Sequence, residues 1–404
     1  MVIMINSFIK KAMLSTIENI TAISHLECSS CGKTYSASEL QTFALCCSKP
    51  LAARYDTNNG FSKSELYNRD NNMWRYAEML PVFSKENIVT LGEGMTPILH
   101  LNNIGNKYDL PFLYVKDESN NPTGSFKARG ISAAISKAKE FGVQQCIIPT
   151  AGNAGGAMAA YCAAAGISAT VVMPAHTPQV FKNECELYGA KLMLVNGLIS
   201  DCGKKVRELN HAGDFFDIST FKEPYRLEGK KTLGYEIAEQ FDWELPDVIL
   251  YPTGGGTGLV GIWKAFEEMI ALGWITDKLP RMIAVQAENC KPIVATWNKL
   301  QSDCKNYIGQ PSLANGLAVP HPFAEDMILE VLKTSGGTTI AVTDEDMIAA
   351  VKEICKAEGL FLAPEGGALL TALLNLIETG QVNRTEKILM LNTGSGYKYL
   401  ENIF

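Results

Sequence analysis

The stretch Asn121-Pro122-Thr123-Gly124-Ser125-Phe126-Lys127-Ala128-Arg129-Gly130 decides how the chain is interpreted. Asn-Pro and Thr-Gly are turn dipeptides, and residues 128–141 then carry apolar side chains at helical spacing. Lys127 is therefore expected between a turn and the start of a helix. A lysine beside an aromatic ring and small residues can be desolvated, which lowers the pKa of its amine and suits it to a Schiff base with an aldehyde. An exposed lysine at a helix start fits this decapeptide equally well, so the rest of the chain must decide.

Outward from this stretch, short apolar segments alternate with segments of helical periodicity. Strands are predicted at 112–116, 146–150, 169–173, 191–195, 248–251, 282–286 and 387–392. Helices are predicted at 128–141, 154–165, 178–188, 201–211, 259–271, 346–358 and 368–378. Apolar strands that alternate with helices indicate parallel sheets covered on both faces. Because the units are too many for one sheet, the sequence predicts an α/β fold with two open, mostly parallel, twisted sheets and a cleft between them.

Composition narrows the class of protein. The chain has 404 residues, of which 47% are hydrophobic, and a formal net charge of -7. The negative charge argues against nucleic acid or an anionic membrane surface as the main partner. No apolar run approaches the roughly 20 residues that a membrane span needs. Since residues 1–13 lack the long apolar core of a signal peptide, we expect a cytoplasmic protein.

The eleven cysteines fall into two groups. Seven are scattered singly and are expected to be small, reduced core residues: Cys146, Cys162, Cys185, Cys202, Cys290, Cys304 and Cys355. The other four, Cys28, Cys31, Cys46 and Cys47, have the spacing of a zinc ribbon. The second pair is adjacent, whereas Cys-x-x-Cys is usual, and adjacent cysteines close a tetrahedral site awkwardly. The alternatives are a zinc site and a ribbon that has lost its metal, and the adjacency favours the second.

Three further motifs follow predicted strands, at the sheet edge where open α/β folds bind ligands. In Pro149–Gly156 the glycines allow close approach, and Asn153 offers an amide to a phenolate oxygen or a carboxylate. Pro252–Gly258 forms a nest of N–H groups suited to a phosphate. In Leu391–Tyr397, Thr393 is placed to point a hydroxyl into the cleft. Taken singly, these motifs also fit a helix start packed through small residues, a bare turn and an ordinary strand-ending turn.

Together the four motifs supply a partner for each handle of pyridoxal 5'-phosphate (PLP). The lysine suits the aldehyde, the amide suits the phenolate oxygen, the N–H nest suits the phosphate, and the hydroxyl suits the ring nitrogen. A hydroxyl partner leaves that nitrogen largely unprotonated, which makes the ring a milder electron sink. The sequence therefore predicts a PLP site in the cleft.

With these motifs the chain resembles the threonine synthase family, among the fold-type II PLP enzymes related to the tryptophan synthase β-subunit. The resemblance covers residues 25–398 and is carried by Asn121–Lys127, the cysteine ribbon and Pro224–Thr232. It implies that Lys127 is catalytic and holds PLP. The other residues implied to bind the cofactor are Asn153 at the phenolate oxygen, Gly254, Gly255, Gly256, Thr257 and Gly258 at the phosphate, and Thr393 at the ring nitrogen.

The resemblance also implies a substrate, a reaction and a domain division. Such enzymes convert O-phosphohomoserine and water to threonine and phosphate, and a homodimer is expected. Thr150 and Ala151 would lie beside the substrate carboxylate, Arg226 would bind an anionic substrate group, and Lys222 would add a second charge. The expected units are 1–60 with the cysteine ribbon, a smaller α/β domain of 95–118 and 132–225, and a larger PLP-binding domain of 61–94, 119–131 and 226–404.

Several positions depart from the family pattern and keep other functions open. Ala128 replaces an aspartate, Thr220 and Phe221 replace an Asn-Ser pair, and Lys230 replaces a glutamine. A β-replacing enzyme acting on O-phosphoserine, similar to cysteate synthase, would share every cofactor residue. A serine/threonine ammonia-lyase would not need Arg226. A non-catalytic PLP-binding protein is the alternative from a different class, and the intact lysine argues against it.

Overall fold

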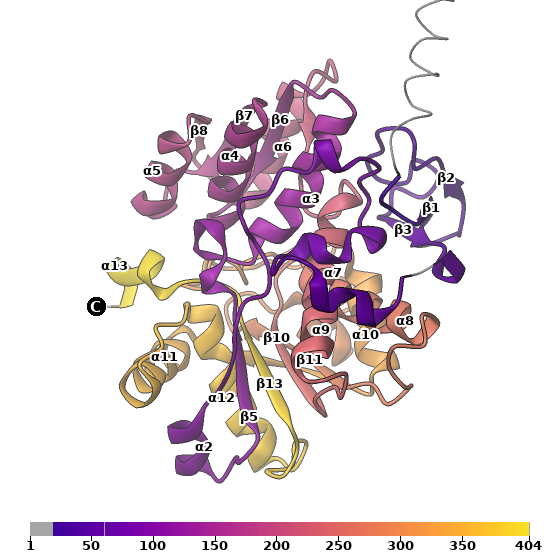
Figure 1. Cartoon of the computed structure of the whole chain (residues 1–404). Coiled ribbons are helices and arrows are strands. Elements are labelled where there is room, and N and C mark those ends of the chain that lie inside the picture. The colour runs from indigo at the N-terminus through magenta and orange to yellow at the C-terminus, as the bar shows by residue number, and fades with distance from the viewer. Residues whose placement is uncertain (1–18, 60, 404) are drawn as a thin grey trace, which may run out of the picture.

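The computed structural model describes residues 19–59 and 61–403. The expectation about residues 1–13, and the first part of the predicted unit 1–60, lie outside these residues. Three bodies are visible in Figure 1: a small β-ribbon, a four-stranded sheet above and a six-stranded sheet below, the two larger sheets each flanked by helices. Among the described residues, no helix combines the length and the apolar character that crossing a membrane requires.

The six-stranded sheet forms the larger body. Its strands are β4 (Ile98–His100), β5 (Leu113–Asp117), β10 (Val248–Pro252), β11 (Arg281–Ala287), β12 (Thr338–Val342) and β13 (Ile388–Asn392), in the order β12-β11-β10-β13-β5-β4. Neighbouring strands are parallel except β4, which is antiparallel to β5. Its helices are α2 (Asn102–Tyr108), α8 (Thr257–Ala271), α9 (Pro292–Trp297), α10 (Glu325–Thr334), α11 (Asp344–Glu358) and α12 (Pro364–Glu378).

Both faces of this sheet are buried, as continuous apolar strands predict. Alternate residues of β10 point to opposite sides. Ile249 and Tyr251 join a core built with α7 and α8, whereas Val248 and Leu250 join a second core built with α11 and α12. The carboxyl ends of the parallel strands are thereby fixed at one edge of the body.

The four-stranded sheet forms the smaller body. Its parallel strands are β6 (Gln145–Pro149), β7 (Ser168–Pro174), β8 (Lys191–Val195) and β9 (Phe216–Asp217), in the order β8-β7-β6-β9. Its helices are α3 (Lys127–Glu140), α4 (Asn153–Ala165), α5 (Gln179–Leu187) and α6 (Ile199–Leu209). The predicted strands and helices of this region agree with the structure to within two residues at most ends.

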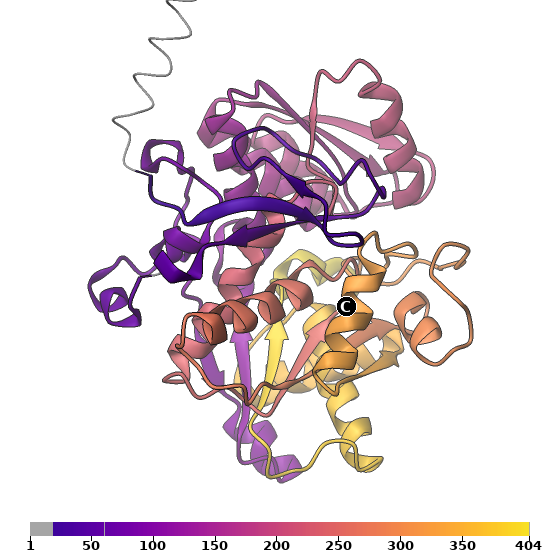
Figure 2. The ribbon, with the colours of Figure 1, turned by 90° about the vertical axis from the view of Figure 1, so that its right-hand side faces the viewer.

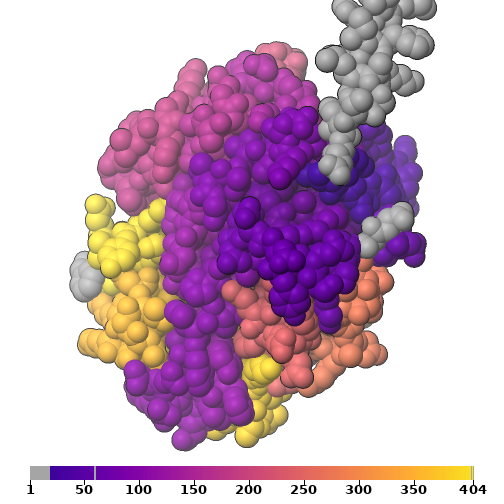
Figure 3. Space-filling view, in the orientation of Figure 1, coloured from indigo at the N-terminus to yellow at the C-terminus, as the bar shows by residue number. Residues whose placement is uncertain are grey.

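One part of the predicted domain division is wrong. The sequence predicts residues 95–118 in the smaller domain, but β5 pairs in parallel with β13 and β4 pairs with β5, so both strands belong to the six-stranded sheet. The pairing joins Leu113 to Ile388, across more than half of the chain, and such a distant partnership leaves no trace in local periodicity. In Figure 3 the purple part of the chain runs down one face of the molecule from the upper body to the lower.

Helix α7 (Tyr225–Gln240) joins the two bodies and was not predicted as a helix. It is buried along nearly its whole length and therefore shows no polar face from which a helical period could be inferred. Two glycines of α7 allow the neighbouring helices α3 and α8 to pack closely against it. A Cβ on Gly229 would lie 2.1 Å from the Arg129 carbonyl oxygen of α3, and one on Gly234 would lie 2.7 Å from the Ile262 carbonyl oxygen of α8.

The remaining segments are short. Between the ribbon and the six-stranded sheet run the 3-10 turns η2 (Thr57–Asn59), η3 (Lys63–Asn68), η4 (Met73–Met79) and η5 (Lys85–Asn87). The turns η6 (Glu118–Asn120) and η7 (Pro122–Gly124) lead into α3, and η8 (Gly396–Tyr399) and α13 (Leu400–Ile403) end the described chain.

The ribbon consists of β1 (Ile23–Cys28), β2 (Thr34–Tyr35) and β3 (Leu51–Tyr55), paired antiparallel in the order β2-β1-β3. Figure 2 shows it lying beside the junction of the two larger bodies. The Gln41 backbone N–H donates to the Tyr225 hydroxyl of α7 at 3.1 Å, and the ring of Phe43 meets that of Phe323 edge-on at 6.0 Å.

Candidate active site

A cavity of about 630 Å³ opens between the two larger bodies. It lies at the carboxyl ends of β6, β10 and β13, because Pro149, Pro252 and Thr393 all line it. Eight of the predicted site residues share its wall: Lys127, Asn153, Lys222, Gly254, Gly255, Gly256, Thr257 and Thr393. The fold thus brings the four sequence motifs together on one cavity.

Lys127 is the first residue of α3 and its side chain is half-buried at the cavity. Its Nζ lies 4.4 Å from the centroid of the Phe126 ring. Loss of water around the amine, helped by the positive charge of Arg226, lowers its pKa to about 8, while the Glu365 carboxylate acts in the opposite direction. An amine in these surroundings is neutral, and therefore nucleophilic, at a pH where an exposed lysine is almost fully protonated.

The lysine motif is held by the motif that follows β13. The Phe126 backbone N–H donates to the Thr393 carbonyl at 3.0 Å, and the Ser395 N–H donates to the Gly124 carbonyl at 2.9 Å. An isolated bridge joins Ser125 to Gly394. Two segments more than 260 residues apart in the chain therefore form one continuous cavity wall, with Lys127 and Thr393 on it.

The glycine loop between β10 and α8 approaches its neighbours as closely as backbone allows. Gly256 has a left-handed backbone with a φ of 77°, which glycine adopts without strain. A Cβ on Gly254 would lie 2.1 Å from the Gly316 carbonyl oxygen. The first-turn amides of α8 lack helical partners and can bind an anion. Gly258 allows the Tyr251 side chain to approach α8, because a Cβ on Gly258 would lie 1.8 Å from the Tyr251 hydroxyl.

Residues of the motif that follows β6 line two different cavities. Asn153 begins α4 and lines the main cavity, whereas Ala151 lines a neighbouring cavity of about 360 Å³ that shares Ile199 and Pro320 with the first. Thr150 is buried, and its hydroxyl accepts the Gly152 N–H at 3.1 Å. The structure therefore does not bring Thr150 and Ala151 onto the same wall as Lys127.

Arg226 lies near Lys127 but is not among the residues that line the cavity. It is 2% exposed, its Nη1 donates to the Ile218 carbonyl at 2.7 Å, and its Nε has no partner. Burial lowers the pKa of the guanidinium, and the carboxylates of Glu223 and Asp217 oppose that shift.

Sequence reasoning missed several groups in and around the cavity. Glu365, at the start of α12, lines it and accepts the Gly316 N–H at 2.9 Å and the Tyr399 hydroxyl at 3.0 Å. Burial raises the pKa of this carboxyl. In the sequence, Glu365 is an acidic residue directly after Pro364. Because this is common at the start of a helix, it did not mark Glu365 as a site residue. Lys204 and Arg207 of α6 also line the cavity, and nothing in their local sequence marks them.

The polar groups around the cavity fit a ligand with several polar handles. Buried side-chain atoms without a hydrogen-bond partner include Ser125 Oγ, Asn153 Oδ1, Tyr251 Oη, Arg226 Nε and Glu365 Oε2. Native proteins leave few buried polar atoms unpaired, and their gathering here indicates a site completed by a bound molecule. With an amine of lowered pKa and an amide-rich glycine loop, the donor set fits PLP.

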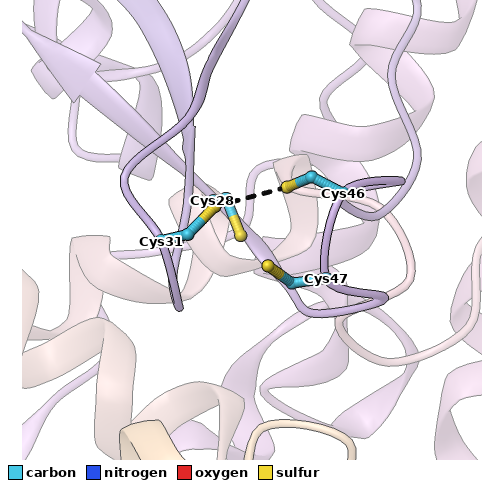
Figure 4. A group of neighbouring side chains, drawn as sticks. All are labelled: Cys28, Cys31, Cys46 and Cys47. Carbon is cyan, nitrogen blue, oxygen red and sulfur yellow. Dashed lines mark hydrogen bonds between the residues drawn. The ribbon is translucent and has the colours of Figure 1, made fainter.

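A second group of side chains lies in the ribbon. The sulfur atoms of Cys28, Cys31, Cys46 and Cys47 all lie within 4.8 Å of one another, and Figure 4 shows all four turned toward a common centre. Four thiolates at this spacing suit tetrahedral zinc. Although Cys46 and Cys47 are adjacent, both sulfurs lie within this distance of the other two.

Comparisons with known proteins identify the family. Residues 89–394 match the family described as pyridoxal-phosphate dependent enzyme. The chain is 35% identical to the threonine synthase of Methanocaldococcus jannaschii over 375 residues, covering 92% of each chain. It is 34% identical to that of Methanosarcina acetivorans over 372 residues, covering 92% of this chain and 91% of the relative.

The fold is also known from solved structures. The processed form of threonine deaminase isoform 2 from Solanum lycopersicum superposes with a TM-score of 0.62 at 20% identity, covering 76% of this chain and 82% of that one. At this identity the likeness establishes the fold alone. The family match and the long alignments to threonine synthases go further, and PLP is the cofactor. The chain belongs to the threonine synthase family of pyridoxal-phosphate-dependent lyases.

Proposed function

We propose that this protein is a threonine synthase that converts O-phospho-L-homoserine and water to L-threonine and phosphate. The observation that carries the proposal is the meeting, on one cavity, of the Lys127 amine, the glycine loop 254–257 and Thr393. Support for the substrate comes from the curated relatives, which bear the name threonine synthase and align over nearly the whole chain.

PLP, when bound, supplies an electron sink that stabilises negative charge at the substrate Cα. The chain's residues would hold it at four places. Lys127 would bind its aldehyde, and the amides of Gly254, Gly255, Gly256 and Thr257 would bind its phosphate. Asn153 would contact its phenolate oxygen and Thr393 its ring nitrogen. A hydroxyl at the nitrogen adds no charge there, so the sink stays mild.

Lys127 would also move protons. Once the substrate amine has taken its place, the freed amine lies where it can accept the Cα proton, and later return it. A pKa of about 8 suits both directions near neutral pH, because neither form of the amine is strongly favoured. Loss of a Cβ proton would then expel phosphate from Cγ, Cγ would gain a proton, and the hydroxyl group of water would add at Cβ. The cavity walls from both bodies would restrict the entry of other water during these stages.

The backbone at Phe221 supports a second candidate reaction, β-replacement on O-phosphoserine. Phe221, at one of the positions that depart from the family pattern, has a left-handed backbone with a φ of 61°. Strained backbone of this kind gathers at functional sites. Thr220 beside it lines the cavity, and its Cγ2 lies 2.9 Å from where a Cβ on Gly255 would stand. A pocket rebuilt at these two residues would suit a shorter phosphorylated substrate such as O-phosphoserine.

The test is to incubate the PLP-loaded protein separately with O-phosphohomoserine, O-phosphoserine with a sulfur nucleophile, and threonine, and to identify the products. We expect threonine and phosphate from the first and no oxoacid from the third. Efficient replacement on O-phosphoserine without threonine formation would establish the β-replacing alternative. An oxoacid from threonine as the main product would establish an ammonia-lyase. Lys127→Ala serves as the inactive control in all three.

A further inference from the structure

Helix α6 forms one wall of the cavity. Its Cys202 and Val206 are buried in a core with the four-stranded sheet. The residues that line the cavity lie on another face of the helix and are Ile199, Ser200, Gly203, Lys204 and Arg207. The i,i+4 pairs 200 with 204 and 203 with 207 explain why these side chains share one face. The helix thus presents two cationic side chains to the cavity.

Arg226, the cation expected from the sequence, is already engaged inside the protein. Its guanidinium lies behind the cavity wall and donates to the Ile218 carbonyl. Burial lowers the pKa of the guanidinium, and the carboxylates of Glu223 and Asp217 oppose that shift. Asp217 itself lines the cavity and accepts the Ser219 N–H at 2.9 Å. Nη1 of the buried guanidinium is therefore occupied by the protein, whereas its Nε has no partner.

The cations at the α6 end of the cavity differ in their pairing with carboxylates. Within residues 19–59 and 61–403, neither Arg207 nor Lys222 has an ion-pair partner. Lys204 lies 2.9 Å from Asp201, but both side chains are exposed, so water and salt screen this pair. The other carboxyl on the wall, Glu365, is disfavoured in its charged form by burial. A positive potential therefore remains at the α6 end of the cavity.

We propose that Arg207 and Lys204 of α6, together with Lys222, bind the distal phosphate of the substrate. The inference rests on the proposed function, and it names the groups that select a phosphorylated amino acid. The substrate extends through the cavity, with its Cα beside Lys127 and its phosphate toward α6. An arginine fork matches two phosphate oxygens at once, and lysines add point charges. Arg226 holds the loop 217–223, which carries Lys222, through the bond from its Nη1 to the Ile218 carbonyl.

The test compares Arg207→Gln, Lys204→Gln/Arg207→Gln and Lys222→Gln in the PLP-loaded protein. The matched control is Lys205→Gln, which removes a lysine of the same helix that pairs with Glu208 at 3.1 Å and does not line the cavity. We expect the double variant to raise the KM for O-phosphohomoserine at least about tenfold while kcat changes less than about twofold. The control should match the wild type, and Arg207→Lys should recover part of the loss.

A second measurement is independent of turnover. Titration of the loaded protein with inorganic phosphate should show an affinity about tenfold lower in the double variant than in the Lys205→Gln control, and a steeper salt dependence in the wild type. Unchanged KM and unchanged phosphate affinity in the double variant would overturn the proposal. If the protein acts on O-phosphoserine instead, the reaction assigned above fails. The KM for O-phosphoserine should still rise in the double variant, which would uphold the phosphate site.

Discussion

The amine of Lys127 has surroundings that favour its neutral form, and this can be measured without cofactor. We expect the reductive methylation rate of Lys127 in the cofactor-free protein to rise with pH to a midpoint near 8, because only the neutral amine reacts. The measurement is peptide mass spectrometry across pH, with exposed lysines of the same sample as reference. In Arg226→Gln the midpoint should move upward, since a positive charge that disfavours protonation is lost. A midpoint equal to that of the exposed lysines would contradict this account of the site.

Lys230 and Lys231 are adjacent and both fully buried, so they show how a carboxylate partner affects the stability of a buried lysine. Among the described lysines that are fully buried, Lys230 alone has no carboxylate within ion-pair distance, and it donates to the Phe126 carbonyl. Lys231, the next residue, lies 2.7 Å from Glu228 and 2.9 Å from Glu268. Burial moves the pKa of Lys230 well below its ordinary value. The fold therefore disfavours its charged form, and this cost grows as the pH falls below that ordinary value.

We expect Lys230→Met to keep the free energy of unfolding within about 1 kcal/mol of the wild type at neutral pH, or to raise it. Lys231→Met should lower it by about 3–5 kcal/mol, because two carboxylates lose a buried partner. The advantage of Lys230→Met should shrink as the pH is raised toward the ordinary lysine value. Urea unfolding of both variants at several pH values makes the comparison. Equal losses in the two variants would show that Lys230 is compensated by a group not identified above.

At the residue level, the sequence predicted what local patterns can encode. Lys127, Asn153 and Thr393 lie on one cavity, as their positions after turns and strands suggested. Arg207 and Glu365 could not be predicted, because their relevance depends on which elements meet across the cleft. Arg226 lies close to the predicted place, but its engagement with Ile218 and nearby carboxyls is visible only in the folded chain.

At the level of elements, the loop that contains Gly316 leaves no room for a side chain at Gly254 in the glycine loop before α8. We expect Gly254→Ala to lower the free energy of unfolding by about 1–3 kcal/mol and to weaken PLP binding, because the added Cβ would lie 2.1 Å from the Gly316 carbonyl oxygen. Gly203→Ala is the matched control for stability. Its Cβ would have Arg207 Nη1 at 3.8 Å as its nearest neighbour, and alanine inside α6 should add about 0.5–1 kcal/mol. Thermal unfolding and cofactor titration test both variants, and an unaffected Gly254→Ala would show that the two loops separate easily.

Most elements of the smaller body were predictable, because short apolar strands alternate there with longer apolar segments of helical length. Strand β9, with two residues, is too short for any pattern. Helix α7 escaped prediction for another reason. It lies between α3 and α8, and its buried ion pairs, including that of Lys231 with Glu228, place charged residues where a period expects apolar ones. Strand β4, only three residues long, is too short for any pattern.

At the level of the whole molecule, strand pairing lay beyond the sequence. Strand β5 lies beside β13, and the lysine motif is bonded to residues 393–395, so contacts between segments hundreds of residues apart decide the arrangement. The α/β class and the two sheets were predicted correctly, since the alternation of strand and helix is local. The partner of each strand had to come from the structure.

The ribbon contacts residues of the cavity wall and of the helices next to it. Phe43 packs on Phe323, which lines the cavity, and Lys222 Nζ lies 5.9 Å from the centroid of the Phe323 ring. Gln41 bonds to Tyr225 of α7, and Lys49 pairs with Asp326 of α10. A metal that orders the loop 41–49 would therefore stiffen the wall that carries Lys222, because metal binding at such thiolate sites is coupled to folding.

We predict one zinc ion per chain, measured by elemental analysis of the purified protein, and its loss in Cys46→Ser/Cys47→Ser. Cys355→Ser, which alters a half-buried thiol outside the ribbon, should leave the metal content unchanged. The metal-free variant should keep its helix content, because both large sheets have cores of their own, but its KM for the phosphorylated substrate should rise severalfold as the Phe43–Phe323 contact loosens. If the zinc-free protein instead keeps the wild-type KM and unfolding midpoint, the ribbon contributes nothing to the cavity wall. The cluster would then serve only the fold of residues 23–55.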